Sequence, residues 1–87
     1  MTSAPFSQPL FTATQLSQLL VASRKRRKLT QAELAQRVGL SQNRISYLER
    51  NPEDLSFRQL LSWCAAIGLE LRLGERGGVE STSVSEW

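Results

Sequence analysis

Four polar side chains in one short segment have the chemistry needed to recognise the edges of DNA bases. They are Ser41, Gln42, Asn43 and Ser46. Each of the two amides can form a pair of hydrogen bonds with adenine, and the two hydroxyls can make shorter contacts. Ile45 and Leu48 fall on the opposite side of a helix, while Tyr47 lies beside the polar group and could contact a base or only pack. The segment predicts a short helix with one buried face and one polar face, a shape that fits the major groove.

Side chains that could contact DNA phosphates surround this segment. Residues 24–28 form an unbroken run of five cations, and Arg44 lies within the polar helix. The phosphate candidates are Gln31, Arg44, Lys25, Arg26 and Lys28. Gln31 would open a preceding helix, whose N-terminus also attracts phosphate. The run could instead stabilise the negative end of a helix dipole, but its position just before the two short helices favours phosphate contact.

Two short helices joined by a tight turn must position these side chains. We expect the helices over residues 31–38 and 42–50. Thr30 is a good N-cap, and Glu33 stands three residues later, which is the capping-box pattern. Gly39 can adopt the positive φ that ends a helix, and Ser41 can cap the next one.

Two further helices should enclose the pair. The first is expected over about residues 14–27, with a buried stripe of Leu16, Leu19, Leu20 and Ser23. The last should begin after Ser56, carry Leu60, Trp63, Cys64 and Ile67 at helical spacing, and stop at Gly68. The Asn51–Pro52 pair separates it from the polar helix, because a residue before proline avoids helical backbone. The sequence therefore predicts an all-α domain of four to five helices.

Residues 69–73 alternate strictly between leucine and charged residues, which is the period of a β-strand. A lone strand cannot satisfy its own backbone groups. The segment either pairs with its copy in a second subunit or continues the last helix. Pairing is favoured because it also produces a two-fold dimer suited to a palindromic operator. The expected dimer-interface residues are Leu69, Leu71, Leu73 and Trp63.

Composition limits the function classes. The 87 residues suffice for one small domain with a thin core, which a second copy could supplement. With no histidine and a single aspartate, the chain cannot build a Ser-His-Asp or Cys-His catalytic set or a Cys/His zinc site. We expect no enzyme, no metal and no cofactor. The lone Cys64 and the lack of a ~20-residue apolar stretch or a basic leader favour a cytoplasmic, nucleoid-associated protein without a membrane segment.

The chain resembles the Cro/phage-repressor (Xre) helix-turn-helix family over about residues 14–68. The matching residues are Leu29-Thr30-Gln31, Glu33-Leu34-Ala35, Val38-Gly39-Leu40-Ser41, Ile45-Ser46 and Leu48-Glu49. The resemblance implies binding to double-stranded DNA at a palindromic operator. It also implies that Arg24 forms a structural ion pair with Glu49, which removes Arg24 from the phosphate candidates. A helical hairpin without a nucleic-acid role is the alternative.

Over nearly its whole length the chain is similar to the antitoxins of HipBA toxin–antitoxin modules. The similarity rests on the helix-turn-helix, the Leu-x-Leu-x-Leu strand, Thr14-Gln15-Leu16, Asn51-Pro52 and the Glu86-Trp87 end. It implies a repressor-like domain whose C-terminal strand pairs across a homodimer. It further implies repression of its own operon and binding to a HipA-like serine/threonine kinase toxin. The alternatives are a stand-alone Xre-type repressor and an interaction adaptor that has lost DNA binding.

The expected organisation has four parts. They are a flexible arm (1–13), the helix-turn-helix domain (14–68), the dimerisation strand (69–73) and a flexible tail (74–87). Residues 1–73 carry ten Lys/Arg and five Asp/Glu, whereas the tail carries one and three. This contrast suits a basic DNA-binding part followed by a separate interaction segment. Trp87 is either an idle end or an apolar anchor that binds the toxin.

Overall fold

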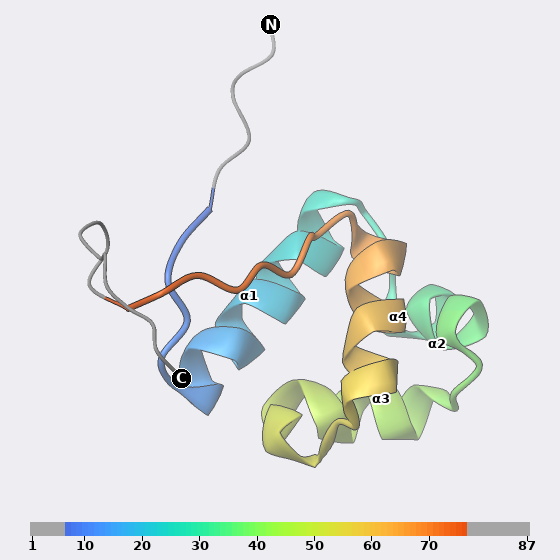
Figure 1. Cartoon of the computed structure of the whole chain (residues 1–87). Helices are drawn as coiled ribbons and strands as arrows, with labels where there is room; N and C mark the ends of the chain where they lie inside the picture. The colour runs from blue at the N-terminus through green and yellow to red at the C-terminus, as the bar shows by residue number, and fades with distance from the viewer. Residues whose placement is uncertain (1–6, 77–87) are drawn as a thin grey trace, which may run out of the picture.

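The computed structural model describes residues 7–76, which form four α-helices (Figure 1). The helices are α1 (Ala13–Arg26), α2 (Gln31–Val38), α3 (Gln42–Arg50) and α4 (Phe57–Ile67). A short 3-10 helix, η1 (Pro52–Asp54), connects α3 to α4. The prediction of an all-helical domain is confirmed for the described residues.

Local capping interactions set the start of most helices. The Thr30 hydroxyl accepts a hydrogen bond from the Glu33 backbone N–H (3.0 Å), and the Glu33 carboxylate accepts one from the Thr30 N–H (2.8 Å). Hydrogen bonds from the backbone and the side chain of Thr30 to the carboxylate lower the pKa of Glu33. Ser56 and Gln59 form an equivalent capping box at α4. A third box was not expected: Thr12 caps α1 together with Gln15, so α1 begins one residue earlier than predicted. Each box satisfies backbone donors that a helix start leaves free.

Residues with left-handed backbone end three of the helices. Gly39 (φ 76°) follows α2 and Gly68 (φ 78°) follows α4, as their spacing predicted. After α1 the left-handed residue is Lys28 (φ 59°), which has a Cβ and therefore occupies this conformation at a cost. The Leu29 N–H then donates to the Arg24 carbonyl (3.1 Å), which closes the end of the helix.

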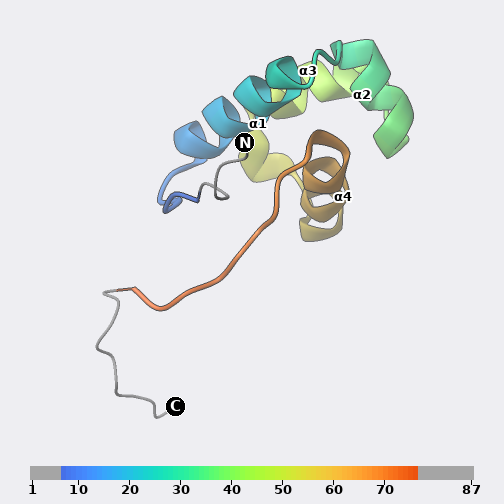
Figure 2. The ribbon, with the colours of Figure 1, turned by 90° about the horizontal axis from the view of Figure 1, so that it is seen from above.

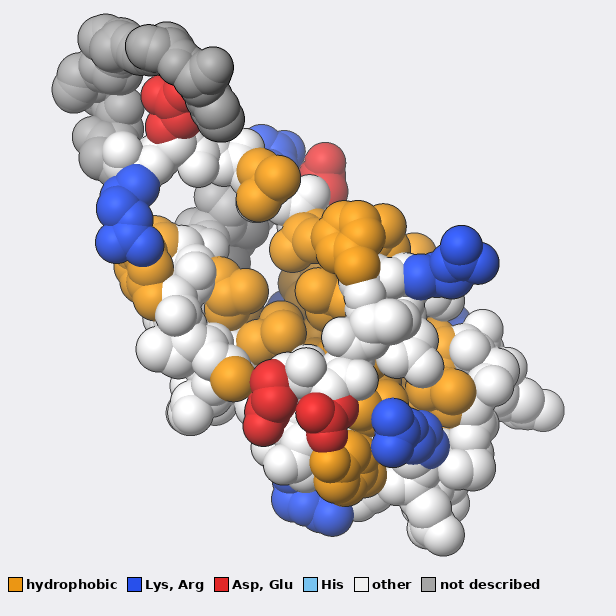
Figure 3. Space-filling view, turned by 60° about the horizontal axis from the view of Figure 1, so that its bottom comes forward, with side chains coloured by type: hydrophobic (Ala, Val, Ile, Leu, Met, Phe, Trp, Pro, Cys, Tyr) orange, Lys and Arg blue, Asp and Glu red, His pale blue; other side chains and the backbone are white. Residues whose placement is uncertain are grey.

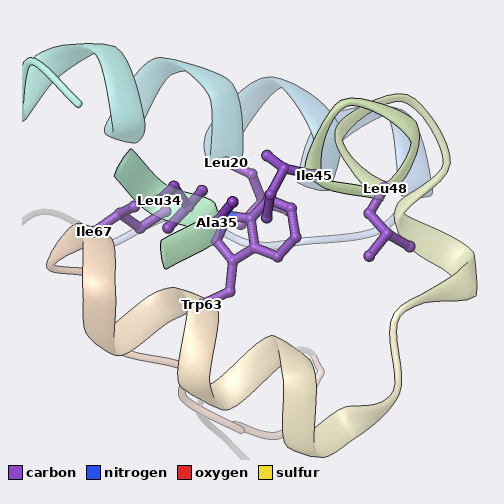
Figure 4. Packing of buried hydrophobic residues seen from close by; sticks show 7 residues of the cluster. All are labelled: Leu20, Leu34, Ala35, Ile45, Leu48, Trp63 and Ile67. Carbon is purple, nitrogen blue, oxygen red and sulfur yellow. The ribbon is translucent and has the colours of Figure 1, made fainter. Parts of the chain in front are cut away.

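The hydrophobic core lies between α4 and the other three helices. Figure 2 shows α1, α2 and α3 on one side and α4 on the other. The core residues, shown in Figure 4, are Leu20, Leu34, Ala35, Ile45, Leu48, Trp63 and Ile67. Trp63 projects from α4 into the middle of this cluster and is 0% exposed. The assignment of Trp63 to a dimer interface was therefore wrong, because its side chain has no surface to offer a second copy.

The segment after α4 is extended rather than helical. Left-handed Gly68 ends the helix, so the leucine-rich segment does not continue α4. Within residues 7–76 it forms no strand pairing, and Figure 2 shows it leading away from the helices. Leu69 packs against the core, whereas Leu71 is 36% exposed and Leu73 is 99% exposed. Pairing with a second subunit stays a prediction, and Trp87 lies outside the described residues.

Candidate nucleic-acid interface

Helices α2 and α3 are joined by residues 39–41 and pack against each other (Figure 1). The Leu40 N–H donates to the Ala35 carbonyl (2.9 Å), which holds the turn against the end of α2. The Ser41 hydroxyl accepts from the Arg44 N–H (3.1 Å) and so fixes the start of α3. Buried Ile45 and Leu48 face the core, so the opposite side of α3 faces solvent.

The polar face of α3 carries two amides that are free to bind a ligand. Gln42 and Asn43 are exposed, and neither side chain has a hydrogen-bond partner among residues 7–76. The serine hydroxyls of this face are already engaged: Ser41 caps α3, and Ser46 accepts a hydrogen bond from Arg50 Nη1 (2.9 Å). The amides are consequently the better candidates for base contacts.

Arg44 lies over an aromatic ring on the same exposed face. Its Cζ is 5.2 Å from the centroid of the Tyr47 ring, which is a cation–π arrangement. The Tyr47 hydroxyl donates a hydrogen bond to the Asp54 carboxylate of η1, and this bond raises the pKa of Tyr47. No sequence pattern predicted the Tyr47–Asp54 contact, since helix periodicity says nothing about a residue beyond the helix end.

A buried ion pair holds the C-terminal end of α3. Arg24 Nε donates to Glu49 Oε2 (2.6 Å) and Arg24 Nη2 to Glu49 Oε1 (3.2 Å), and both residues are buried. The remaining Arg24 nitrogen, Nη1, donates to the Leu29 carbonyl (2.8 Å). The pair that the family resemblance implies thus lies in contact, and Arg24 is not available to DNA.

Gln31 joins this buried network. Its Nε2 donates to Glu49 Oε1 (3.0 Å), and its side chain is half-buried. One proton of the Gln31 amide is therefore used in a hydrogen bond to α3 and is not available to a phosphate. The backbone N–H of Gln31, the first residue of α2, is one of the groups that a helix N-terminus leaves without an intrahelical partner.

The cationic run divides into residues with different environments. Lys25, Arg26, Arg27 and Lys28 are all exposed. Arg26 Nη2 donates to Ser23 (3.0 Å), which ties one cation to α1. The Arg27 guanidinium lies against Gly68: a Cβ there would be 1.9 Å from Arg27 Nη2. A Cβ at this position would displace the end of the exposed Arg27 side chain, whereas the left-handed backbone of Gly68 (φ 78°) is the stronger reason for a glycine.

Another structural contact of this region was also not predicted. The Ser17 hydroxyl on α1 donates to the backbone carbonyl of Glu49 (2.5 Å), at the end of α3. The two residues are 32 positions apart, so no local pattern could have shown the bond.

Other kinds of site have little support in the described residues. Across residues 7–76 no group of His, Cys, Asp and Glu side chains could hold a metal ion. The same part of the chain contains no helix that is long and apolar enough to cross a membrane. Cys64 is buried, and desolvation raises the pKa of its thiol. Together α2, its turn and α3 define a helix-turn-helix protein.

Comparison with known proteins identifies the same kind of domain. A family model described as helix-turn-helix matches residues 20–74. Antitoxin HipB of Escherichia coli O6:H1 is 30% identical over 66 residues, which cover 76% of this chain and 70% of that protein. The chain belongs to the helix-turn-helix family and, within it, to the HipB antitoxins.

The fold also resembles that of solved HipB structures, including two complexes. A HipA-HipB-O2-O3 complex contains a chain with a TM-score of 0.72 and 27% identity, and the match covers 80% of this chain and 99% of that one. A HipB-O1-O2 complex contains a chain with a TM-score of 0.71 and 28% identity, covering 79% and 100%. The similarity thus includes nearly all of each HipB chain.

Proposed function

We propose that the protein is a DNA-binding antitoxin that represses its own operon and binds a HipA-like serine/threonine kinase toxin. It would act in the cytoplasm, at the nucleoid, by binding and not by catalysis. The observation that carries the proposal is the exposed face of α3, where the amides of Gln42 and Asn43 have no partner among the described residues.

Recognition of an operator would combine base and phosphate contacts. The two free amides suit adenine. Ser41 and Ser46 each accept one hydrogen bond within the domain, so their hydroxyl protons remain available to contact a base. Gln31, Arg44, Lys25, Arg26 and Lys28 would contact phosphates and fix the orientation of α3 without selecting a sequence. We interpret O1, O2 and O3 in the similar HipB complexes as operator DNA, which supports this assignment.

A homodimer would let two copies of α3 bind a palindromic operator. The exposed large apolar residues are Leu10, Phe11, Tyr47, Phe57, Leu61, Leu71 and Leu73. Figure 3 shows a face on which apolar side chains gather between charged ones. Contiguous apolar surface of this kind is usually covered by a partner. We infer that residues 69–73 pair with the same segment of a second copy, with Leu69, Leu71 and Leu73 at the interface and Trp63 in the core of each subunit.

The toxin contact is proposed to include Trp87, which lies outside the described residues. A tryptophan offers a large apolar area and an indole donor, and it is among the commonest hot-spot residues of interfaces. The presence of HipA with HipB in one of the similar complexes supports a toxin as the partner. Deleting Glu86 and Trp87 should weaken toxin binding in calorimetry while leaving operator binding intact. Equal toxin affinity with and without the two residues would exclude the anchor.

A combined binding experiment tests the function as a whole. The protein should shift a fragment of its own promoter in a mobility assay, and a HipA-like kinase encoded in the same operon should co-purify with it. Promoter binding without any toxin would instead indicate a stand-alone Xre-type repressor. Failure to shift promoter DNA would exclude the repressor function and leave a protein-interaction role.

A further inference from the structure

Three side chains on the outer face of α3 and the following η1 form a connected series. The Arg44 guanidinium lies over the Tyr47 ring, with Cζ 5.2 Å from the centroid. The Tyr47 hydroxyl donates to the Asp54 carboxylate. The series therefore runs from an exposed cation through an aromatic ring to an exposed carboxylate.

The backbone fixes both ends of this series. Arg44 and Tyr47 are three residues apart on one helix, so their side chains lie on the same face. Asp54 belongs to η1, whose first residue, Pro52, is buried. The Asp54 N–H also donates to the Asn51 carbonyl (3.0 Å). Because η1 is held against the domain, its hydrogen bond with the phenol restrains the ring, and the ring in turn restrains the guanidinium.

The contacts of Tyr47 leave it poorly suited to base recognition. Its hydroxyl is already used by Asp54, and one face of its ring is covered by Arg44. The hydrogen bond also orients the Asp54 carboxylate toward the phenol. Without that bond the carboxylate could pair with Arg44 or repel a nearby phosphate.

We infer that Tyr47 is a positioning residue, which together with Asp54 holds the Arg44 guanidinium ready to bind a DNA phosphate. The inference rests on the proposed function, in which α3 binds DNA. Ordering a long side chain on binding costs free energy, and a guanidinium that is already ordered avoids most of this cost. Arg44 is thereby prepared to bind beside the bases that Gln42 and Asn43 contact.

A double-mutant cycle with operator DNA tests the role of Tyr47. Tyr47→Leu should weaken operator binding about two- to ten-fold, the range expected when one side chain must be ordered on binding. In an Arg44→Gln background the same change should have a much smaller effect, because no guanidinium is left to position and only the released Asp54 carboxylate can still act on a phosphate. Tyr47→Phe, which keeps the ring but loses the hydrogen bond to Asp54, should bind the operator more tightly than Tyr47→Leu and less tightly than the parent protein. Equal losses from Tyr47→Leu in both backgrounds would show that Tyr47 contacts DNA directly and would overturn the inference.

Arg37 provides a matched control for the cycle. It is an exposed arginine on the neighbouring α2 and lies over no ring among the described residues. Whatever effect Arg37→Gln has by itself, it should add to that of Tyr47→Leu. Coupling as strong as that seen with Arg44 would indicate a general disturbance of the domain and would also overturn the inference.

Two measurements on the free protein separate this inference from the proposed function. The side-chain NMR signals of Arg44 should be shifted by the ring current of Tyr47 and should move to ordinary positions in Tyr47→Leu. Unshifted Arg44 signals would overturn the inference even if the protein binds its operator. Conversely, shifted Arg44 signals in a protein that binds no DNA would refute the proposed function. The Arg44–Tyr47 contact would then exist, but it would not serve to bind a phosphate.

The second measurement concerns the link between Tyr47 and Asp54. Tyr47 is the single tyrosine of the chain, so the absorbance of its phenolate can be titrated without interference from another tyrosine. The hydrogen bond to Asp54 raises the pKa of Tyr47. Asp54→Ala should therefore lower this pKa and should weaken operator binding in the same direction as Tyr47→Leu. An unchanged phenol titration would show that Asp54 has no part in positioning the ring.

Discussion

Among single residues, Glu49 has the most connected side chain of the candidate interface. Its two carboxylate oxygens accept hydrogen bonds from Arg24 on α1 and from Gln31 on α2, and Glu49 is only 4% exposed. A buried charge is tolerated when it is paired and its lone pairs are satisfied, as they are here. Three helices meet at this carboxylate, so it sets the orientation of α3 relative to α1 and α2.

Removing this carboxylate should destabilise the domain strongly. Glu49→Ala leaves the Arg24 guanidinium buried without a carboxylate to balance its charge, which we expect to lower the free energy of unfolding by about 3–5 kcal/mol. Urea denaturation followed by circular dichroism measures the change. Glu53→Ala removes an exposed carboxylate of η1 and should cost less than about 1 kcal/mol. Similar values for the two variants would mean that water reaches the ion pair.

Base recognition is also a property of single residues. Gln42→Ala should remove roughly 1–3 kcal/mol of discrimination at one operator position, because a bidentate amide–adenine contact is lost. Competition binding with operator and scrambled DNA measures it. Gln18, an exposed glutamine on α1, gives a control substitution that should leave discrimination unchanged. If Gln42→Ala binds both DNAs as the parent protein does, Gln42 is not a base contact.

At the scale of secondary-structure elements, interactions at the helix ends determine where each helix begins and stops. Capping boxes begin α1, α2 and α4, and glycines with left-handed backbone end α2 and α4. The exception is the end of α1, where left-handed backbone falls on Lys28 (φ 59°). This exposed residue is also one of the phosphate candidates, so stability and proposed function make opposite demands on it.

Replacing Lys28 with glycine should separate these two demands. Lys28→Gly should raise the free energy of unfolding by about 1 kcal/mol, because glycine adopts left-handed backbone without a Cβ clash. It should also weaken binding to all DNA sequences and flatten the salt dependence, since one cation is lost. Urea denaturation and salt titrations measure the two effects.

Lys25→Gly is the matched control for this prediction. It removes the same charge but places glycine inside α1, where it should lower the free energy of unfolding by about 1 kcal/mol. A loss of stability in both variants would show that contacts of the Lys28 side chain stabilise the domain by more than its left-handed backbone destabilises it.

For the whole molecule, the exposed leucines after α4 point to a second copy. Leu71 and Leu73 contribute little to the monomer, because they are 36% and 99% exposed. Two linked copies of α3 are also what a palindromic operator requires, with half-sites roughly 34 Å apart. The monomer's own core, centred on buried Trp63, does not depend on this contact.

A charge in the predicted interface tests the dimer. Leu71→Asp should keep the monomer folded, since Leu71 lies at its surface, but should abolish dimerisation and operator binding together. Sedimentation measures the oligomeric state, and circular dichroism checks the fold. Arg72→Asp introduces the same carboxylate on the opposite side of the predicted strand and should leave the dimer intact. A dimeric Leu71→Asp protein would refute the intersubunit strand.

Features governed by neighbouring residues were determined by the sequence alone. The capping boxes, the glycine turns and the periodicity of α2, α3 and α4 depend on groups within about four positions of each other. Such features predicted the helices to within a residue or so, and they predicted that Gln42 and Asn43 would be exposed while Ile45 and Leu48 are buried.

Contacts between distant residues were decided by the tertiary structure. The Gln31–Glu49 bond spans 18 positions and the Ser17–Glu49 bond spans 32. The spacing of Trp63 placed it on an apolar face but could not tell whether its own helices or a second copy would cover that face. Only the packing of α4 against the other helices settled this, because burial depends on which elements meet in space and not on the order of residues along the chain.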